Sequence, residues 1–232
     1  MSREVNNFEE YLKPTKLCNI NHPKILPRAA EITNGAVTKK EVASRIFYWV
    51  RDNIKFGLYF SQTKASTTLH YRIGECVNKT NLHVALLRAT GIPARFRYSL
   101  CKKGVLEGII SNFIYNNIGA EASHFWCECH LDGRWISCES FFDKPLYDGM
   151  CQIHPGFGTL VPSIDWDVQT DLVVSQPWIT TDRGSLSSAD EAMAVLNLRE
   201  EGMLPPFLER LAWPIFYLSA RTSDKIRLFK PA

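Results

Sequence analysis

The 232-residue sequence lacks any long run of apolar residues. Its most apolar late stretch, residues 204–218, is interrupted by three prolines and by Glu209 and Arg210, so we expect no membrane-spanning segment and no membrane partner. The first ten residues contain no apolar core, and we expect neither a secretory signal nor an Arg-rich transit peptide. These absences predict a cytoplasmic protein.

Runs of like charge are also missing. The 27 basic and 24 acidic side chains give a net charge of +3, and the basic residues are scattered along the chain. A nucleic-acid partner is therefore not expected. The sequence has no glycine-rich phosphate loop and no EF-hand loop, so we expect no nucleotide or other organic cofactor and no bound calcium.

Paired cysteine motifs are absent as well. Seven cysteines, an odd number without a signal peptide, indicate free thiols in a reducing compartment rather than a disulfide framework. The nearest approach to a metal site is the group Cys127, Cys129, His130 and Cys138, which contains no CxxC pair. Strand alternation places His130 on the face opposite the two neighbouring cysteines, so we expect no metal and keep a zinc-stabilised hairpin only as a remote alternative.

The pattern of the remaining residues predicts an α+β protein. Apolar residues recur with helical spacing from residue 39 to about 53, and residues 94–100 alternate as in a strand. We divide the chain into an N-terminal extended segment (1–38), a core (39–180) and a C-terminal helical extension packed on the core (181–232). Residues 56–71 and 143–187 are interpreted as loops, and helices are expected near 188–201, with Ser188 as N-cap, and 205–220.

Residues 77–90 form a helical run that is too continuously apolar for a surface helix. We expect it to be the central, largely buried helix, packed on an antiparallel sheet and ended by Gly91 and Pro93. Cys76 stands where this helix begins. The positive end of a helix and a nearby imidazolium both lower the pKa of a thiol, so Cys76 is a candidate nucleophile with a lowered pKa. The competing interpretation is a cysteine that only packs in the core.

A β-hairpin is the clearest element of the sequence. Residues 124–131 and 134–141 flank Asp132-Gly133, a pair that favours a type I′ turn. With a two-residue turn, His124 and Glu139 share a face and are diagonal neighbours roughly 7–8 Å apart, a gap that their side chains can bridge. Such a carboxylate would orient the imidazole and stabilise its charged form. Asp143 is the other diagonal neighbour and competes for this role.

Three blocks of residues resemble the transglutaminase-like superfamily, whose core is papain-like. The blocks are residues 46–56 (IFYWVRDNIKF), residues 74–76 with 85–95 (GEC and ALLRATGIPAR), and residues 124–128 with 132–135 (HFWCE and DGRW). The resemblance implies a nucleophilic Cys76, a general base and acid in His124, and a third member at Glu139, where the family usually has aspartate.

This resemblance implies chemistry on a peptide, amide or thioester substrate. Cys76 would attack a carbonyl carbon, and water or an amine would then resolve the thioester, so the protein would be an acyltransferase or an amidohydrolase. The alternative is a catalytically inactive member of the family that serves as a binding or scaffold protein. The sequence leaves open the substrate, the choice between hydrolysis and transfer, the second oxyanion donor and the oligomeric state.

Overall fold

The computed structural model describes residues 8–198 and 219–229. Within these residues no helix is both long and apolar enough to cross a membrane. The elements are η1 (Phe8–Leu12), α1 (Ile25–Thr33), α2 (Lys39–Asn53), β1 (Lys55–Phe56), α3 (Ala65–Tyr71), β2 (Ile73–Gly74), α4 (Cys76–Ala89), β3 (Ala94–Lys102), η2 (Lys103–Leu106), α5 (Asn112–Asn117), β4 (Glu121–Leu131), β5 (Arg134–Ser137), α6 (Lys144–Ile153), α7 (Pro155–Leu160), η3 (Gln176–Trp178), β6 (Ile179–Leu186) and α8 (Ala189–Leu198).

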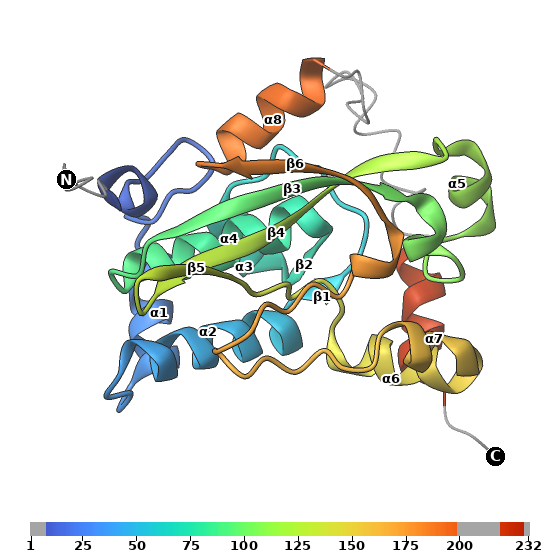
Figure 1. The fold of residues 1–232 in the computed structure, drawn as a ribbon, viewed down its shortest axis with the longest axis horizontal. Helices are drawn as coiled ribbons and strands as arrows, with labels where there is room; N and C mark the ends of the chain where they lie inside the picture. The colour runs from blue at the N-terminus through green and yellow to red at the C-terminus, as the bar shows by residue number, and fades with distance from the viewer. Residues whose placement is uncertain (1–7, 199–218, 230–232) are drawn as a thin grey trace, which may run out of the picture.

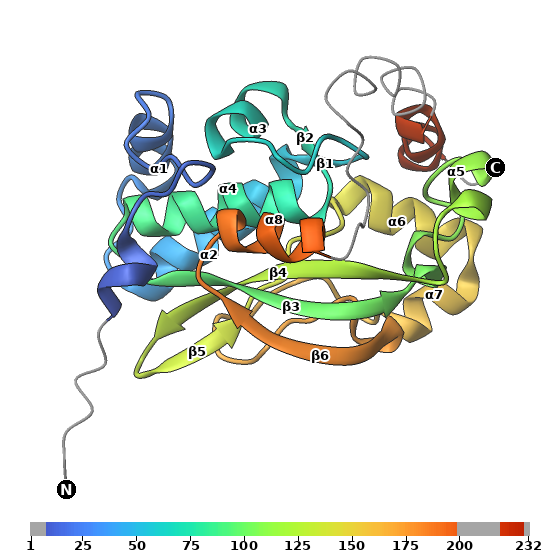
Figure 2. The same ribbon diagram turned by 90° about the horizontal axis from the view of Figure 1, so that it is seen from above.

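The main sheet is antiparallel, with strand order β5-β4-β3-β6. Helix α4 lies along one face of this sheet and contacts β3 and β4. Helices α1 and α3 pack on the side of α4 that faces away from the strands, while α2 lies beside α4 and also contacts β4 (Figures 1 and 2). A short parallel pair, β1 and β2, leads directly into the start of α4. The prediction of an α+β fold with a central helix on an antiparallel sheet is confirmed.

Helix α4 is buried along almost its whole length. Its first residue is preceded by Glu75, whose carboxylate accepts a hydrogen bond from the Val77 N–H, while the Asn78 side chain accepts one from the Glu75 N–H. These two reciprocal bonds satisfy backbone donors that the first turn of a helix leaves open. At the other end Gly91 adopts φ +75°, the left-handed conformation that favours glycine, and ends the helix as predicted.

The hairpin between β4 and β5 has the predicted register. Asp132 and Gly133 both have positive φ, as a type I′ turn requires, and Glu128 pairs with Ser137. The second strand is shorter than predicted. After Cys138 donates its N–H to the Cys127 carbonyl, the chain leaves β4, and the Glu139 N–H donates to the carbonyl of Leu172.

Three loop predictions are wrong. The N-terminal segment contains α1, in which Pro27 falls in the first turn, where proline is tolerated. Residues 56–71 contain α3. The longest expected loop, 143–187, contains α6 and α7 and adds β6 to the sheet beside β3. In this last segment the elements are short, and prolines at the start of both helices resemble loop signals.

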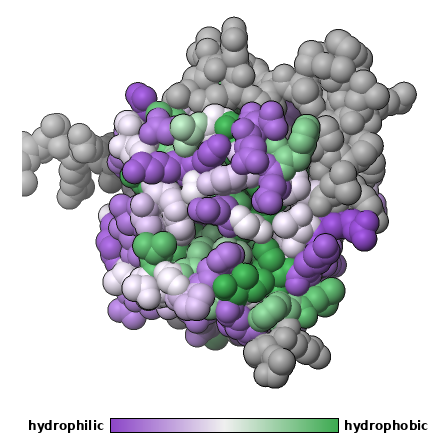
Figure 3. Space-filling view, turned by 90° about the vertical axis from the view of Figure 1, so that its right-hand side faces the viewer, coloured by the Kyte–Doolittle hydropathy of each residue, from purple (hydrophilic) through white to green (hydrophobic). Residues whose placement is uncertain are grey.

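The C-terminal helices are confirmed only in part. Helix α8 begins next to Ser188, whose hydroxyl accepts from the Glu191 N–H as predicted, although the Glu191 carboxylate binds Ser187. Most of the helix expected at 205–220 lies outside the described residues, and residues 219–227 are helical. Figure 3 views the end of the molecule that carries α5, α6 and α7, where apolar residues such as Phe113 and Leu160 are exposed among polar ones.

Lys79 is an unusual member of the buried helix, because its side chain is 1% exposed. Its ammonium group donates to the carbonyl oxygens of Arg51 and Ile54, at the end of α2. Burial lowers the pKa of Lys79 from 10.5 to about 7, against the raising effect of the Asp143 charge. At low pH the side chain of Lys79 is protonated although it is buried, and this lowers the free energy of unfolding.

We expect substitution Lys79→Met to reveal this cost as a pH-dependent difference in stability. Because the pKa is lower in the folded than in the unfolded state, the penalty is full below about pH 7 and is relieved as the pH rises towards 10.5. The free energy of unfolding of the wild type should therefore rise relative to K79M between pH 7 and 9. Urea unfolding of both proteins under reducing conditions measures this, and a constant difference would contradict it.

Candidate active site

Cys76 lies at the meeting point of the two apolar clusters of the protein. It is half-buried and packs against both the cluster around α4 and the cluster around Phe141 and Phe142. The N-terminal position on α4 is fixed by the capping bonds of Glu75 described above. The sequence prediction that Cys76 begins the central helix is therefore confirmed.

The main chain of Phe125 connects α4 to β4 at this point. Its N–H is hydrogen-bonded to the Cys76 sulfur, and its carbonyl accepts from the hydroxyl of Thr80, one turn further along α4. His124 precedes Phe125 directly on β4. The peptide that carries the candidate base is thus held against the helix that carries the candidate nucleophile.

His124 and Glu139 meet as the hairpin predicts. The distance between His124 Nε2 and Glu139 Oε1 is 2.7 Å, and both side chains are at most 5% exposed. The other carboxylate oxygen of Glu139 accepts from both the main-chain N–H and the hydroxyl of Ser175. Phe141 packs edge-on against the imidazole. Three donors and an aromatic wall therefore fix the Glu139 carboxylate and the His124 ring.

Asp143, the competing acid, is engaged elsewhere. Its carboxylate forms a buried ion pair with Arg227 at 2.6 Å and accepts from the N–H groups of Phe56 and Leu146. The last of these bonds makes Asp143 the N-cap of α6. Burial alone would raise its pKa, but Arg227 and Lys79 outweigh that effect and lower it. Asp143 is therefore a structural carboxylate in this fold.

The Cys76 thiol does not follow the sequence prediction of a lowered pKa. Burial raises the pKa of Cys76 well above its ordinary value, and the adjacent Glu75 carboxylate raises it further. The N–H groups of Phe125 and Val77 act in the opposite direction but are weaker. The thiol donates to Glu75 Oε2 at 3.0 Å, and among the described residues no hydrogen bond joins it to His124.

Sequence reasoning missed Glu75 and Ser175 as parts of this site. Glu75 is named in the sequence motif only as the residue between Gly74 and Cys76, and glutamate is not among the residues preferred at an N-cap, so its capping role has little sequence signal. Ser175 lies in a segment interpreted as a surface loop, and its hydrogen bonds to Glu139 depend on the tertiary fold. The zinc alternative of the sequence analysis loses one of its ligands, because His130 packs against the rings of Phe8 and Trp135 instead of joining the cysteines.

A comparison with known families now decides where this arrangement belongs. Residues 27–140 match the model of the transglutaminase-like superfamily. This part of the chain belongs to that superfamily. The match includes both Cys76 and His124 and extends to Glu139, the three positions that the sequence motifs of the transglutaminase-like superfamily single out.

Solved structures resemble the transglutaminase-like fold described here. One is a proposed cysteine protease from Cytophaga hutchinsonii, with a TM-score of 0.52, 19% sequence identity and coverage of 81% of this chain and 49% of that protein. Another is a proposed protease from Parabacteroides distasonis, with a TM-score of 0.37, 14% identity and coverage of 56% of this chain and 24% of that one. This chain thus spans about half of the first and a quarter of the second. A search of curated proteins finds no match.

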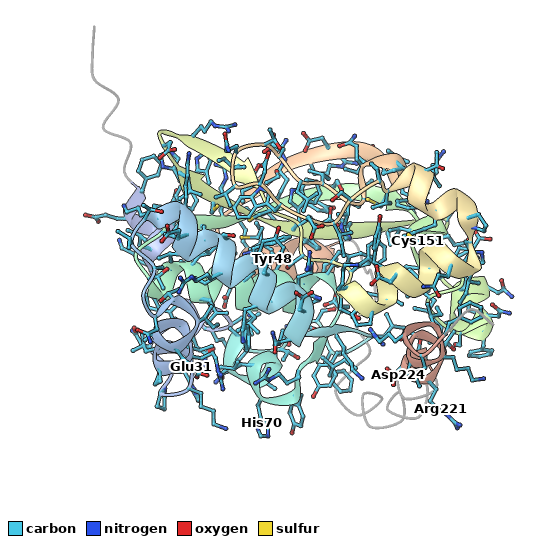
Figure 4. The ribbon with its side chains drawn as sticks, turned by 90° about the horizontal axis from the view of Figure 1, so that it is seen from below. Glu31, Tyr48, His70, Cys151, Arg221 and Asp224 are labelled. Atoms are coloured by element: carbon cyan, nitrogen blue, oxygen red, sulfur yellow. The ribbon has the colours of Figure 1, made fainter. Side chains whose placement is uncertain are left out.

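We expect Glu75→Gln to make Cys76 more reactive. The glutamine amide oxygen can still accept from the Val77 N–H, but it removes the charge that raises the pKa of Cys76. The midpoint of the pH–alkylation profile of Cys76 should move to lower pH, as read by mass spectrometry of the Cys76 peptide. Glu31→Gln, at an exposed position of α1 (Figure 4), is the control and should leave the midpoint unchanged. An unchanged midpoint in E75Q would contradict this account.

We expect Asp143→Ala to destabilise the fold by about 3–5 kcal/mol, because it leaves the buried Arg227 guanidinium without its main partner. Asp224→Ala is the matched control. Asp224 also binds Arg227, but it is 46% exposed and lies on the surface of the C-terminal helical segment (Figure 4). Its loss should cost less than about 1 kcal/mol. Chemical denaturation of both variants measures the difference, and equal losses would contradict the structural role of Asp143.

Proposed function

We propose that Cys76, His124 and Glu139 form a catalytic triad that breaks or exchanges an amide or thioester bond through a thioester on Cys76. The observation that carries this proposal is the buried His124–Glu139 hydrogen bond of 2.7 Å, on a histidine whose next residue binds the Cys76 sulfur. A carboxylate in this position holds the ring in one orientation and stabilises its protonated form.

The hydrogen bond of His124 to Glu139 decides which ring nitrogen of His124 takes part in proton transfer. Because Nε2 of His124 faces Glu139, the proton of the Cys76 thiol passes to Nδ1. The raised pKa of Cys76 means that the thiol is protonated before the reaction, so His124 must act as a general base during the attack. Sulfur leaves its hydrogen bond with Glu75 in this step. In proteins without bound substrate, such catalytic hydrogen bonds often form only when the substrate arrives.

The bond changes form two half-reactions. Sulfur bonds to the substrate carbonyl carbon, and the negative oxygen that develops is stabilised by the main-chain N–H of Cys76 at the start of α4. The C–N or C–S bond then breaks, and His124 returns its proton to the leaving amine or thiol. In the second half, His124 deprotonates water or an amine, which attacks the thioester carbon. The C–S bond breaks, and His124 returns the proton to the departing Cys76 sulfur, which restores the resting thiol. Water gives hydrolysis, and an amine gives transfer.

A peptide is the substrate class that we propose. The solved protein from Cytophaga hutchinsonii is described as a proposed cysteine protease, and peptide bonds and glutamine side-chain amides both fit the chemistry above. Whether water or an amine resolves the thioester depends on how far the site excludes water. A peptide library incubated with and without a primary amine distinguishes the two by the mass of the products.

We expect Cys76→Ala to abolish turnover and Glu139→Gln to lower kcat by on the order of 100- to 10,000-fold, because the amide cannot stabilise a protonated imidazole. Glu128→Gln is the matched control, since Glu128 is also a buried glutamate on this hairpin but pairs with Arg95. Its kcat should be close to that of the wild type. Full turnover by C76A, with the thermal unfolding midpoints of all variants similar, would disprove the proposal.

A further inference from the structure

A second group of reactive side chains lies behind the proposed triad. The ligand atoms of His83, Cys127 and Cys138 all lie within 4.8 Å of one another, and the three residues are buried. None of them takes part in the chemistry proposed above. All seven cysteines lie among the described residues, and each is a free thiol.

The cluster joins the three segments of the chain that also carry the proposed triad. His83 is on α4 after Cys76, Cys127 is on β4 after His124, and Cys138 directly precedes Glu139. Cys127 and Cys138 are neighbours across the hairpin, because the Cys138 N–H donates to the Cys127 carbonyl at 2.8 Å. The thiol of Cys138 also interacts with that of Cys129, which shares the face of β4 with Cys127. Four potential ligands therefore converge on one side of the hairpin.

The two ring nitrogens of His83 differ in their surroundings. Its Nδ1 lies 3.5 Å from the hydroxyl of Ser140, whereas its buried Nε2 has no hydrogen-bond partner among the residues that the structure describes. A metal-binding histidine commonly uses one ring nitrogen for the ion and the other for a neighbouring polar group.

We infer that His83, Cys127 and Cys138 bind one zinc ion, with Cys129 completing a tetrahedral set of three sulfurs and one nitrogen. This ligand set is one that structural zinc sites use. In a tetrahedral site the ligand atoms are about 3.5–3.8 Å apart, given Zn–S and Zn–N bonds of about 2.3 and 2.0 Å. The group of His83, Cys127 and Cys138 would therefore contract by about 1 Å at most, and the Cys129 side chain, which lies outside that group, would move towards the ion.

Charge and proton balance favour this occupant. Each thiol that binds the ion releases its proton to solvent, and the sulfur–zinc bond replaces the sulfur–hydrogen bond. The dication offsets two of the three thiolate charges, and Arg88, whose charge acts on Cys127, opposes the one that remains. The ion would also satisfy Nε2 of His83. Its role would be structural, because it would fasten α4 to both strands of the hairpin next to the proposed triad.

The test is a titration of reduced, metal-free protein with Zn²⁺, followed by a titration with Co²⁺ as a spectroscopic probe. We expect one equivalent of Zn²⁺ to bind, and Co²⁺ to give the sulfur-to-metal charge-transfer and tetrahedral d–d absorption bands of a thiolate site. We also expect Zn²⁺ to raise the thermal unfolding midpoint of the wild type, since it binds only the folded state. These measurements need no variant.

Variants then locate the site. Cys138→Ser and His83→Gln should weaken Zn²⁺ binding by about 100-fold or more and remove the rise in the unfolding midpoint. Cys151→Ser is the matched control and should bind as the wild type does, because Cys151 lies in α6 (Figure 4) and packs against the other apolar cluster. Circular dichroism confirms that each variant is folded. Absence of stoichiometric binding by the folded wild type would overturn the inference, and so would wild-type affinity in C138S.

Discussion

Burial of α4 on all sides obliges its polar side chains to find hydrogen-bond partners inside the protein. The partners are mostly main-chain carbonyl groups of the surrounding segments. Asn78 donates to Phe60 and Ser61, Lys79 to Arg51 and Ile54, Thr80 to Phe125, Asn81 to Leu17 and Thr63, and Arg88 to Lys13, Ala94 and Ser187. The helix therefore fixes segments that are far apart in the chain, and the position of its first residue relative to β4 is defined by these bonds.

The same burial sets the chemical character of the site. It raises the pKa of Cys76, because a thiolate is poorly solvated at this position, and it strengthens the His124–Glu139 hydrogen bond, because little water competes for either partner. A resting thiol beside a firmly oriented histidine is suited to a reaction in which the proton moves only when a carbonyl carbon is present. Glu75 serves two functions here, since its carboxylate caps α4 and also accepts a hydrogen bond from the Cys76 thiol.

Local signals account for the parts of the fold that could be predicted from sequence. The helix stop at Gly91, the turn at Asp132-Gly133 and the buried character of α4 depend on short-range backbone preferences and on apolar spacing. The His124–Glu139 contact was predictable because the hairpin register holds as far as Cys138, the residue directly before Glu139. Other features depend on which distant segments pack together. They are the raised pKa of Cys76, the ion pair of Asp143 with Arg227 and the cluster of His83 with two cysteines. Composition also concealed α6 and α7, because short helices with proline and glycine resemble loops, and it concealed β6, whose residues are mostly polar.

The ion pair between Asp143 and Arg227 can form only late in the synthesis of the protein. The two residues are 84 positions apart, and Arg227 also donates to the carbonyl of Phe56. On the ribosome, Cys76, His124 and Glu139 are all translated well before Arg227 exists. Asp143, four residues after Glu139, therefore lacks the guanidinium of Arg227 until translation has reached residue 227. The nascent chain thus contains the whole proposed triad before the segment that follows its third member can be fastened in place.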